Sequence, residues 1–171
     1  MTEMTIDGYD VQLLNALQSD GRATNSALGE KIHLSTSQVS RRVQRLEECG
    51  LISHYAAVLN SDMIGLDVVV YTHVTLSRQA EQASVFEKAI MDLPEVLECQ
   101  LVTGEADYIL RIAAPDLTSF SDFLEKKILS LSSVANVRSI VSLKTVKRTS
   151  SLPLGHLSQP RKVKTQLLFT R

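Results

Sequence analysis

Residues Leu34-Ser-Thr-Ser-Gln-Val-Ser-Arg-Arg-Val-Gln-Arg-Leu-Glu-Glu-Cys-Gly50 decide how the first half of the chain folds. Val39, Val43 and Leu46 are spaced i, i+4, i+7, so a helix gathers them on one apolar face. Ser35 suits the cap of its first turn, and Gly50 suits a left-handed helix end. The opposite face carries hydroxyl, amide and guanidinium groups: Thr36, Ser37, Gln38, Ser40, Arg41, Arg42, Gln44 and Arg45. Such groups bond phosphates and base edges, which indicates a recognition helix; the plain alternative is a solvated surface helix.

Two shorter helices are predicted before this stretch. The first runs from Ile6 to Ser19, with Asp7 or Asp10 near its positive end. Asp20-Gly21 is a turn signal, Thr24 caps a short helix through Ile32, and His33-Leu34 connects it to the third. This order predicts a helix-turn-helix, and a plain three-helix bundle does not explain the polar outer face. The apolar run Leu51 to Leu59 is expected to form a small hairpin, or wing.

The second half reads as a ferredoxin-like βαββαβ domain, so the fold class is α+β. The expected strands are Asp67–Leu76, Val96–Val102, Asp107–Ala113 and Val134–Val146. A helix over 80–92 should bury Val85, Phe86, Ala89 and Ile90. A second, opened by Pro115-Asp116, should bury Leu117, Phe120, Phe123, Leu124, Ile128 and Leu129. The helices cover one sheet face, and the apolar other face predicts dimerisation sheet to sheet.

The expected domains are a winged helix-turn-helix over 1–60, a linker over 61–67, a ferredoxin-like oligomerisation domain over 68–150, and a tail over 151–171. The tail is interpreted as partly flexible and basic, either touching phosphates or simply frayed.

Composition narrows the class of protein. The chain has 171 residues, a formal charge of −1 and 44% hydrophobic residues. Residues 1–60 hold five Lys/Arg and seven Asp/Glu, while residues 146–171 hold six and none. An acidic DNA-binding half must concentrate its positive charge on one face. The sequence contains no long apolar run, no signal peptide and no metal-binding cysteine pattern. We therefore expect a cytoplasmic protein that has no metal or cofactor and is not bound to a membrane.

The chain resembles the Lrp/AsnC ("feast/famine") transcription factors over about residues 5–155. The matching residues are Asp7, Asp10, Leu13, Leu14, Asp20, Gly21, Arg22, Leu34, Ser35, Val39, Ser40, Arg42, Val43, Arg45, Leu46, Glu47, Gly50, Leu51, Ile52, Tyr55, Ala57, Leu59, Leu93, Pro94, Val96, Thr103, Gly104, Asp107 and Tyr108. The resemblance implies a non-enzymatic regulator whose dimers bind double-stranded operator DNA and assemble into octamers. It also implies an amino-acid effector bound between subunits.

The expected DNA-contacting residues are Ser35, Thr36, Ser37, Gln38, Ser40, Arg41, Arg42 and Arg45. Arg42→Ala is expected to weaken operator binding while leaving folding intact. By resemblance, the effector lies beside Thr103, Gly104, Asp107 and Tyr108. For Gly104 the alternative is an ordinary hairpin turn, and for Asp107 a turn-capping carboxylate.

Two other functions stay open. Some proteins of this superfamily decarboxylate sirohaem, and His73 with Arg111 are the candidates for such a site. The Arg-rich third helix argues against that enzyme. The other alternative is an amino-acid-binding module without DNA binding, which the acidic N-terminal half favours.

Overall fold

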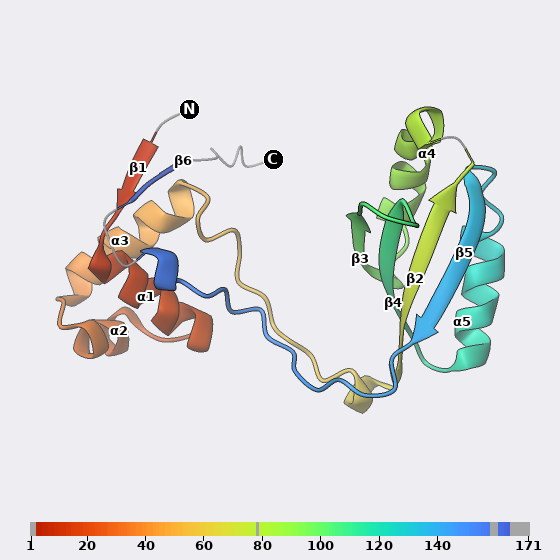
Figure 1. Cartoon of the computed structure of the whole chain (residues 1–171). Helices are drawn as coiled ribbons and strands as arrows, with labels where there is room; N and C mark the ends of the chain where they lie inside the picture. The colour runs from red at the N-terminus through yellow and green to blue at the C-terminus, as the bar shows by residue number, and fades with distance from the viewer. Residues whose placement is uncertain (1–2, 78, 158–160, 165–171) are drawn as a thin grey trace. The chain divides into compact units, whose positions relative to one another are not determined.

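The computed structural model of the chain describes residues 3–77, 79–157 and 161–164 (Figure 1). Its contacts divide the chain into two compact units. We call Met1–Ala57 with Lys147–Arg171 the helical unit, and Val58–Val146 the sheet unit. The helical unit is therefore built from both ends of the chain. The expected limits 1–60, 61–67, 68–150 and 151–171 stay predictions.

Three helices form most of the helical unit: α1 (Gly8–Ser19), α2 (Asn25–Ile32) and α3 (Thr36–Glu48). Each begins where a side chain accepts a hydrogen bond from a first-turn N–H, at Asp7, Thr24 and Ser35. Gly50, at φ 77°, follows the end of α3. The caps at Thr24 and Ser35 confirm the starts predicted for the second and third helices. The first helix begins at Gly8 rather than Ile6, because Ile6 belongs to a strand and Asp7 caps the helix. The shared core contains Leu13, Leu14, Ala16, Leu28, Ile32, Val39 and Leu46.

The turn between α2 and α3 is tight. His33 adopts a left-handed conformation with φ 58°, and the Leu34 N–H donates to the Gly29 carbonyl at 2.9 Å. A Cβ on Gly29 would lie 2.4 Å from the Leu34 carbonyl oxygen, so only glycine fits there. This close approach sets α2 against α3 and completes the expected helix-turn-helix.

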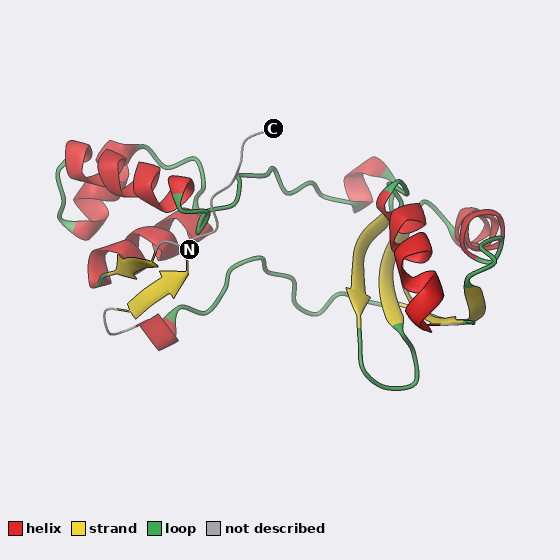
Figure 2. Cartoon of the chain, turned by 90° about the horizontal axis from the view of Figure 1, so that it is seen from above, coloured by secondary structure: helices red, strands yellow, loops and turns green. Residues whose placement is uncertain are grey.

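Two short strands complete the helical unit. The first, β1 (Glu3–Ile6), pairs antiparallel with β6 (Arg161–Lys164), and Figure 2 shows both in yellow near the helices. The expected hairpin over 51–59 was wrong, because no strand forms there. That stretch holds no Gly, Pro, Asn or Asp to make a tight turn, and its Tyr55 and Val58 are exposed.

The sheet unit follows the βαββαβ order. Strands β2 (Val68–Leu76), β3 (Val96–Leu101), β4 (Tyr108–Ala114) and β5 (Val134–Val141) form an antiparallel sheet in the order β3-β4-β2-β5. Helix α4 spans Gln79–Met91, and α5 (Leu117–Phe123) continues into a π-helical turn, η2 (Leu124–Ile128). Phe86, Ile90, Phe120, Phe123 and Ile128 pack with Val70, Val74, Leu110 and Ile112 in one core. This confirms the ferredoxin-like prediction and leaves one sheet face without helices.

Some helix faces were predicted wrongly. Val85, Leu117 and Leu129 are exposed rather than buried. Val85 and Phe86 are adjacent, and neighbouring helix positions point in different directions, so one of the two turns outward. The last strand also ends at Val141 rather than Val146. Short 3₁₀ turns occupy Asp62–Ile64 (η1) and Gly155–Leu157 (η3).

Candidate functional site

The outer face of α3 begins at a reciprocal cap. The Gln38 N–H donates to Ser35 Oγ at 3.3 Å, and the Ser35 N–H donates to Gln38 Oε1 at 3.0 Å. This capping box satisfies two first-turn donors. Ser35 and Gln38, both expected at DNA, thus hold the start of the helix while remaining exposed.

Two of the three α3 arginines are joined to the start of α1. Asp10 is fully buried, and its two carboxylate oxygens accept from Arg42 Nη1 and Arg45 Nη2, each at 2.6 Å. Arg42 Nη1 also lies 2.9 Å from the Asp7 carboxylate, and its guanidinium carbon lies 5.5 Å from the Tyr9 ring centre. A buried carboxylate needs such partners because an unpaired buried charge is costly. Sequence reasoning placed Asp7 and Asp10 at a helix end but did not join them to α3.

Opposing effects set the pKa values in this cluster. Partial burial acts to raise the pKa of Asp7, but hydrogen bonds from the Asp10 N–H and the Arg42 guanidinium outweigh it and hold that pKa below its usual value. Desolvation acts to lower the pKa of Arg42, but its hydrogen bonds to Asp10 and Asp7 raise the net value. Both groups are therefore charged at neutral pH.

The ion pairs change the expectation for Arg42. Its side chain is only 24% exposed, whereas that of Arg45 is 45% exposed. The expectation that Arg42→Ala leaves folding intact conflicts with this geometry, since the substitution removes one of the two arginines paired with a buried carboxylate. Arg42 positions α3 within the helical unit. Arg45 retains more access to solvent.

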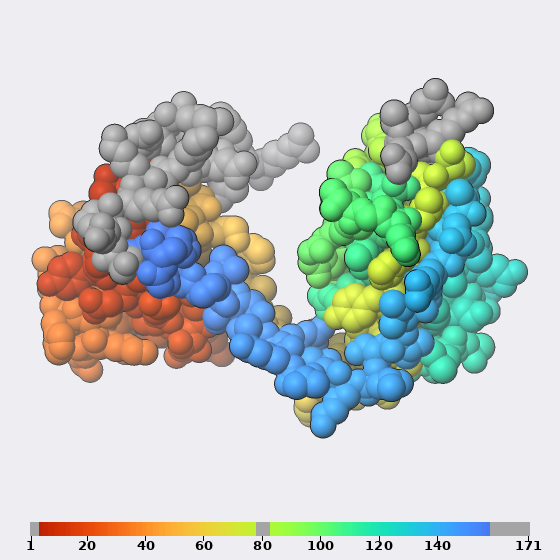
Figure 3. All heavy atoms as spheres, in the orientation of Figure 1, coloured from red at the N-terminus to blue at the C-terminus, as the bar shows by residue number. Residues whose placement is uncertain are grey.

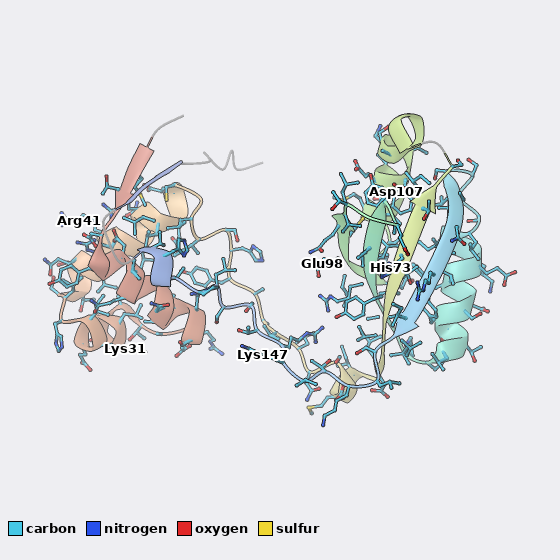
Figure 4. All side chains as sticks on the ribbon, in the orientation of Figure 1. Lys31, Arg41, His73, Glu98, Asp107 and Lys147 are labelled. Carbon is cyan, nitrogen blue, oxygen red and sulfur yellow. The ribbon has the colours of Figure 1, made fainter. Side chains whose placement is uncertain are left out.

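The remaining α3 side chains leave a polar surface. Thr36, Ser37, Ser40 and Arg41 are exposed, and no ion pair is described for Arg41, which Figure 4 labels. A shallow hollow is lined by Arg41, Arg42, Gln44, Arg45 and Glu48. Gln44 and Glu48 were not among the expected contact residues; they share a 2.8 Å hydrogen bond across one helical turn. Their i, i+4 spacing was the available signal.

The four expected effector residues come together in the sheet unit. Thr103, Gly104, Asp107 and Tyr108 line one open pocket of about 430 Å³, together with Leu76, Ala83, Leu101, Val102 and Ala106. Gly104 has φ 129°, a conformation that other residues rarely adopt, so glycine shapes the turn from β3 to β4. The pocket wall divides about evenly between polar and apolar surface, which suits a small organic ligand with both polar and apolar parts.

Asp107 shapes the pocket through the backbone. It is 8% exposed, and one carboxylate oxygen accepts from the Leu76 N–H at 2.7 Å. Its own N–H donates to the Val74 carbonyl at 2.9 Å, and its carbonyl accepts from the Val102 N–H. The Leu76 N–H belongs to β2, so this carboxylate holds the end of β2 beside the start of β4 and does not cap its own turn, the alternative considered from the sequence. Asp107 also takes part in the pocket wall.

Tyr108 is the other buried polar group of the pocket. Its hydroxyl donates to Glu87 at 2.8 Å, and its ring centre lies 4.9 Å from that of Phe86. Burial, followed by the hydrogen bond and the negative charge of Glu87, raises the pKa of Tyr108 to about 12. Tyr108 is therefore a neutral wall residue at physiological pH.

The two residues considered for an enzyme lie elsewhere. Strand register pairs His73 with Ile109 and Tyr71 with Arg111, which sets His73 and Arg111 on the same sheet face. Arg111 Nε lies 3.4 Å from the Glu98 carboxylate, and neither His73 nor Arg111 lines the pocket beside Gly104. Figure 4 labels His73, Glu98 and Asp107 in this unit.

Within residues 3–77, 79–157 and 161–164, no group of three or more His, Cys, Asp or Glu is placed to hold a metal ion. Among those same residues, no helix is both long and apolar enough to span a membrane.

The family models match both halves of the chain. Residues 6–47 match the AsnC-type helix-turn-helix domain, and residues 69–152 match the Lrp/AsnC ligand binding domain. The fold and site thus define a transcriptional regulator with a helix-turn-helix and a ligand-binding domain. The leucine-responsive regulatory protein of Rhizobium meliloti (strain 1021) is 34% identical over 148 residues, covering 86% of this chain and 95% of that protein. Its counterpart in Escherichia coli (strain K12) is 35% identical, with 86% and 90% covered. The chain belongs to the Lrp/AsnC family.

Two solved structures of transcriptional regulators share the fold of this chain. A transcriptional regulator of Neisseria meningitidis, crystallised in complex with L-methionine, superposes with a TM-score of 0.86 at 38% identity, covering 89% of this chain and 99% of that one. An AsnC family regulator of Agrobacterium tumefaciens gives 0.84 at 30% identity, with the same coverage. These relatives are named as regulators rather than enzymes.

Proposed function

We propose that the chain regulates transcription by binding double-stranded operator DNA through the exposed face of α3. Ser37, Ser40 and Arg41 face solvent at the helix start and middle, with Ser35, Thr36 and Gln38 beside them. The single observation that carries this proposal is the anchoring of Arg42 and Arg45 by buried Asp10, which fixes the orientation of that face. Arg42 acts mainly by positioning, and Arg45 contributes toward phosphate. Arg41 is the main candidate for a base or phosphate contact.

The effector we propose is an amino acid held beside Thr103, Gly104, Asp107 and Tyr108. The pocket lining supports such a ligand because its wall is part polar and part apolar, like an amino acid with an apolar side chain; the apolar part comes from Leu76, Ala83, Leu101 and Ala106. The Neisseria relative was crystallised with L-methionine, an amino acid of that kind. Binding would alter DNA affinity or assembly, and the proposal includes no catalytic step, cofactor or metal.

Assembly is proposed through the helix-free face of the sheet. Tyr71 and Ile140 lie at paired positions of β2 and β5 and are 42% and 47% exposed. Large apolar side chains on an open face favour a second copy as cover. We propose a homodimer that assembles further, to an octamer or a similar closed form, and acts in the cytoplasm.

The test is binding of the purified protein to its own upstream DNA, by fluorescence anisotropy at physiological salt, with each amino acid added in turn. Arg41→Gln is expected to weaken operator binding by about 1–3 kcal/mol, roughly fivefold to 160-fold. Lys127→Gln, an exposed charge in the sheet unit, is the matched control and should bind as the unaltered protein does. Equal affinity of the two variants would refute the α3 assignment. Binding that no amino acid alters would refute the effector.

A further inference from the structure

The N-terminal part of the helical unit is a poor match for DNA by charge alone. Residues 1–57 hold five Lys/Arg and seven Asp/Glu, a formal charge of −2. Arg42 and Arg45 are moreover paired with Asp7 and Asp10. Because affinity for a phosphate backbone depends on cations that replace its counterions, this part alone provides little of that attraction.

The C-terminal segment docks onto this same unit. The Leu152 N–H donates to Gln18 Oε1 at 2.6 Å, and Gln18 Nε2 donates back to the Leu152 carbonyl at 3.2 Å. Leu154 packs against the core of the three helices, and Leu157 is buried. Strand β6 then pairs with β1 over four residues. Figure 3 shows the blue segment lying against the red and orange helices.

Docking reverses the charge of the unit. Residues 147–164 hold five basic residues and no acidic one: Lys147, Arg148, Arg161, Lys162 and Lys164. Adding +5 to −2 gives +3. Lys147 and Arg148 are exposed, and no ion pair is described for either; Figure 4 labels Lys147. Arg161, Lys162 and Lys164 are held on the unit by the backbone pairing of β6, which fixes the strand position independently of their side chains.

We propose that residues 147–157 and 161–164, attached to the helical unit through Leu152, Leu157 and β6, form a second DNA-contacting surface, which binds backbone phosphates without reading sequence. Lysine and arginine on an extended backbone suit phosphate oxygens, whereas base reading needs groups placed in a groove. The inference rests on the proposed function, since α3 supplies the specificity that this surface lacks. A merely solvated tail would not need backbone pairing and a buried leucine to attach it to the unit that carries α3.

The experiment compares two neutralised variants of the full chain, K147Q/R148Q and R161Q/K162Q/K164Q. K126Q/K127Q is a control in which two charges are removed from the sheet unit. Affinity for operator and for an unrelated duplex is measured over a range of salt. Removing one phosphate-binding cation should reduce the steepness of log K against log salt by about 0.9, so the double variant changes it by about 1.8 and the triple variant by about 2.7. Affinity should fall for both duplexes alike, leaving their ratio unchanged.

Several outcomes overturn the proposal. An unchanged salt slope in both variants, or an equal change in K126Q/K127Q, removes the phosphate role. A fall in the ratio with an unchanged slope would mean that the segment contributes to sequence reading instead. K147Q/R148Q lies outside the β1–β6 pairing, so it remains informative if the triple variant unfolds. In contrast, Arg41→Gln should lower the ratio of the affinity for operator to the affinity for the unrelated duplex. If the unaltered protein shows no preference for any operator, the proposed function itself fails.

Discussion

Each unit of the molecule buries one aspartate at its candidate site, and the two are held differently. Asp10 in the helical unit is bound mainly by side chains, the guanidinium groups of Arg42 and Arg45, and it also accepts from the Asp7 N–H. Asp107 in the sheet unit is bound by backbone, including the Leu76 N–H. The first carboxylate orders charged groups on a surface, while the second orders the chain around a pocket.

The difference follows from what each site must present. A surface for DNA needs cations held in position but still accessible, and a buried carboxylate behind them fixes their orientation. A pocket for a small ligand needs a rigid wall, and a carboxylate bonded to backbone N–H groups supplies it. The same side-chain type thus serves orientation in one unit and backbone shape in the other.

The largest effect should come from Asp10→Ala. It removes two charge-assisted hydrogen bonds and the bond from the Asp7 N–H, and leaves Arg42 and Arg45 without their shared partner. We expect the free energy of unfolding to fall by about 3 kcal/mol. This value is at the lower end of the range for removing one partner of a buried ion pair, because both arginine side chains still reach solvent. Urea denaturation followed by helix ellipticity measures it.

Glu30→Ala, an exposed carboxylate on α2, is the matched control and should unfold as the unaltered protein does. Asp10→Asn should fall between the two, since the amide keeps an acceptor but loses the charge. A stable Asp10→Ala protein with normal operator affinity would show that the arginines do not need this carboxylate.

Asp107→Ala should have the next largest effect. The Leu76 N–H loses a buried acceptor, which costs about 1–3 kcal/mol. Asp107→Asn retains an acceptor oxygen, so its stability should lie closer to that of the unaltered protein. Calorimetry with the effector then separates the two roles. If Asp107→Asn is stable but binds no amino acid, the carboxylate contacts the ligand; if it binds normally, the role of the carboxylate is to hold β2 beside β4.

The smallest expected effect is the loss of stability at low pH when Asp7 becomes protonated. The pKa of Asp7 lies below its ordinary value of 3.8, so its ionised form stabilises the folded state above that pH. This contribution should be lost as pH falls through the depressed pKa of the folded state. Asp7 is 41% exposed, and solvent screening therefore keeps the effect below about 1 kcal/mol. Denaturation midpoints of Asp7→Asn and the unaltered protein should converge at low pH and differ at neutral pH; parallel curves would contradict the role of Asp7.

Local signals predicted most of the fold. The caps at Thr24 and Ser35 and the alternation of strand residues act over a few positions, and these elements formed where the sequence placed them. The pocket residues Thr103 to Tyr108 were also found together, because one turn holds them all. Pairing between distant segments left no such local signal. Asp10 meets Arg42 across 32 positions and Arg45 across 35, and β1 meets β6 from the opposite end of the chain.

The pairing of β1 with β6 also orders events during synthesis. Because β6 follows the whole sheet unit along the chain, the sheet unit leaves the ribosome before the helical unit can acquire this strand. At about 5–20 residues per second, the three helices wait several seconds without that strand. A chain interrupted before residue 147 therefore has the pocket beside Gly104 but lacks β6, the buried Leu157 and the positive charge that this segment brings to the helical unit.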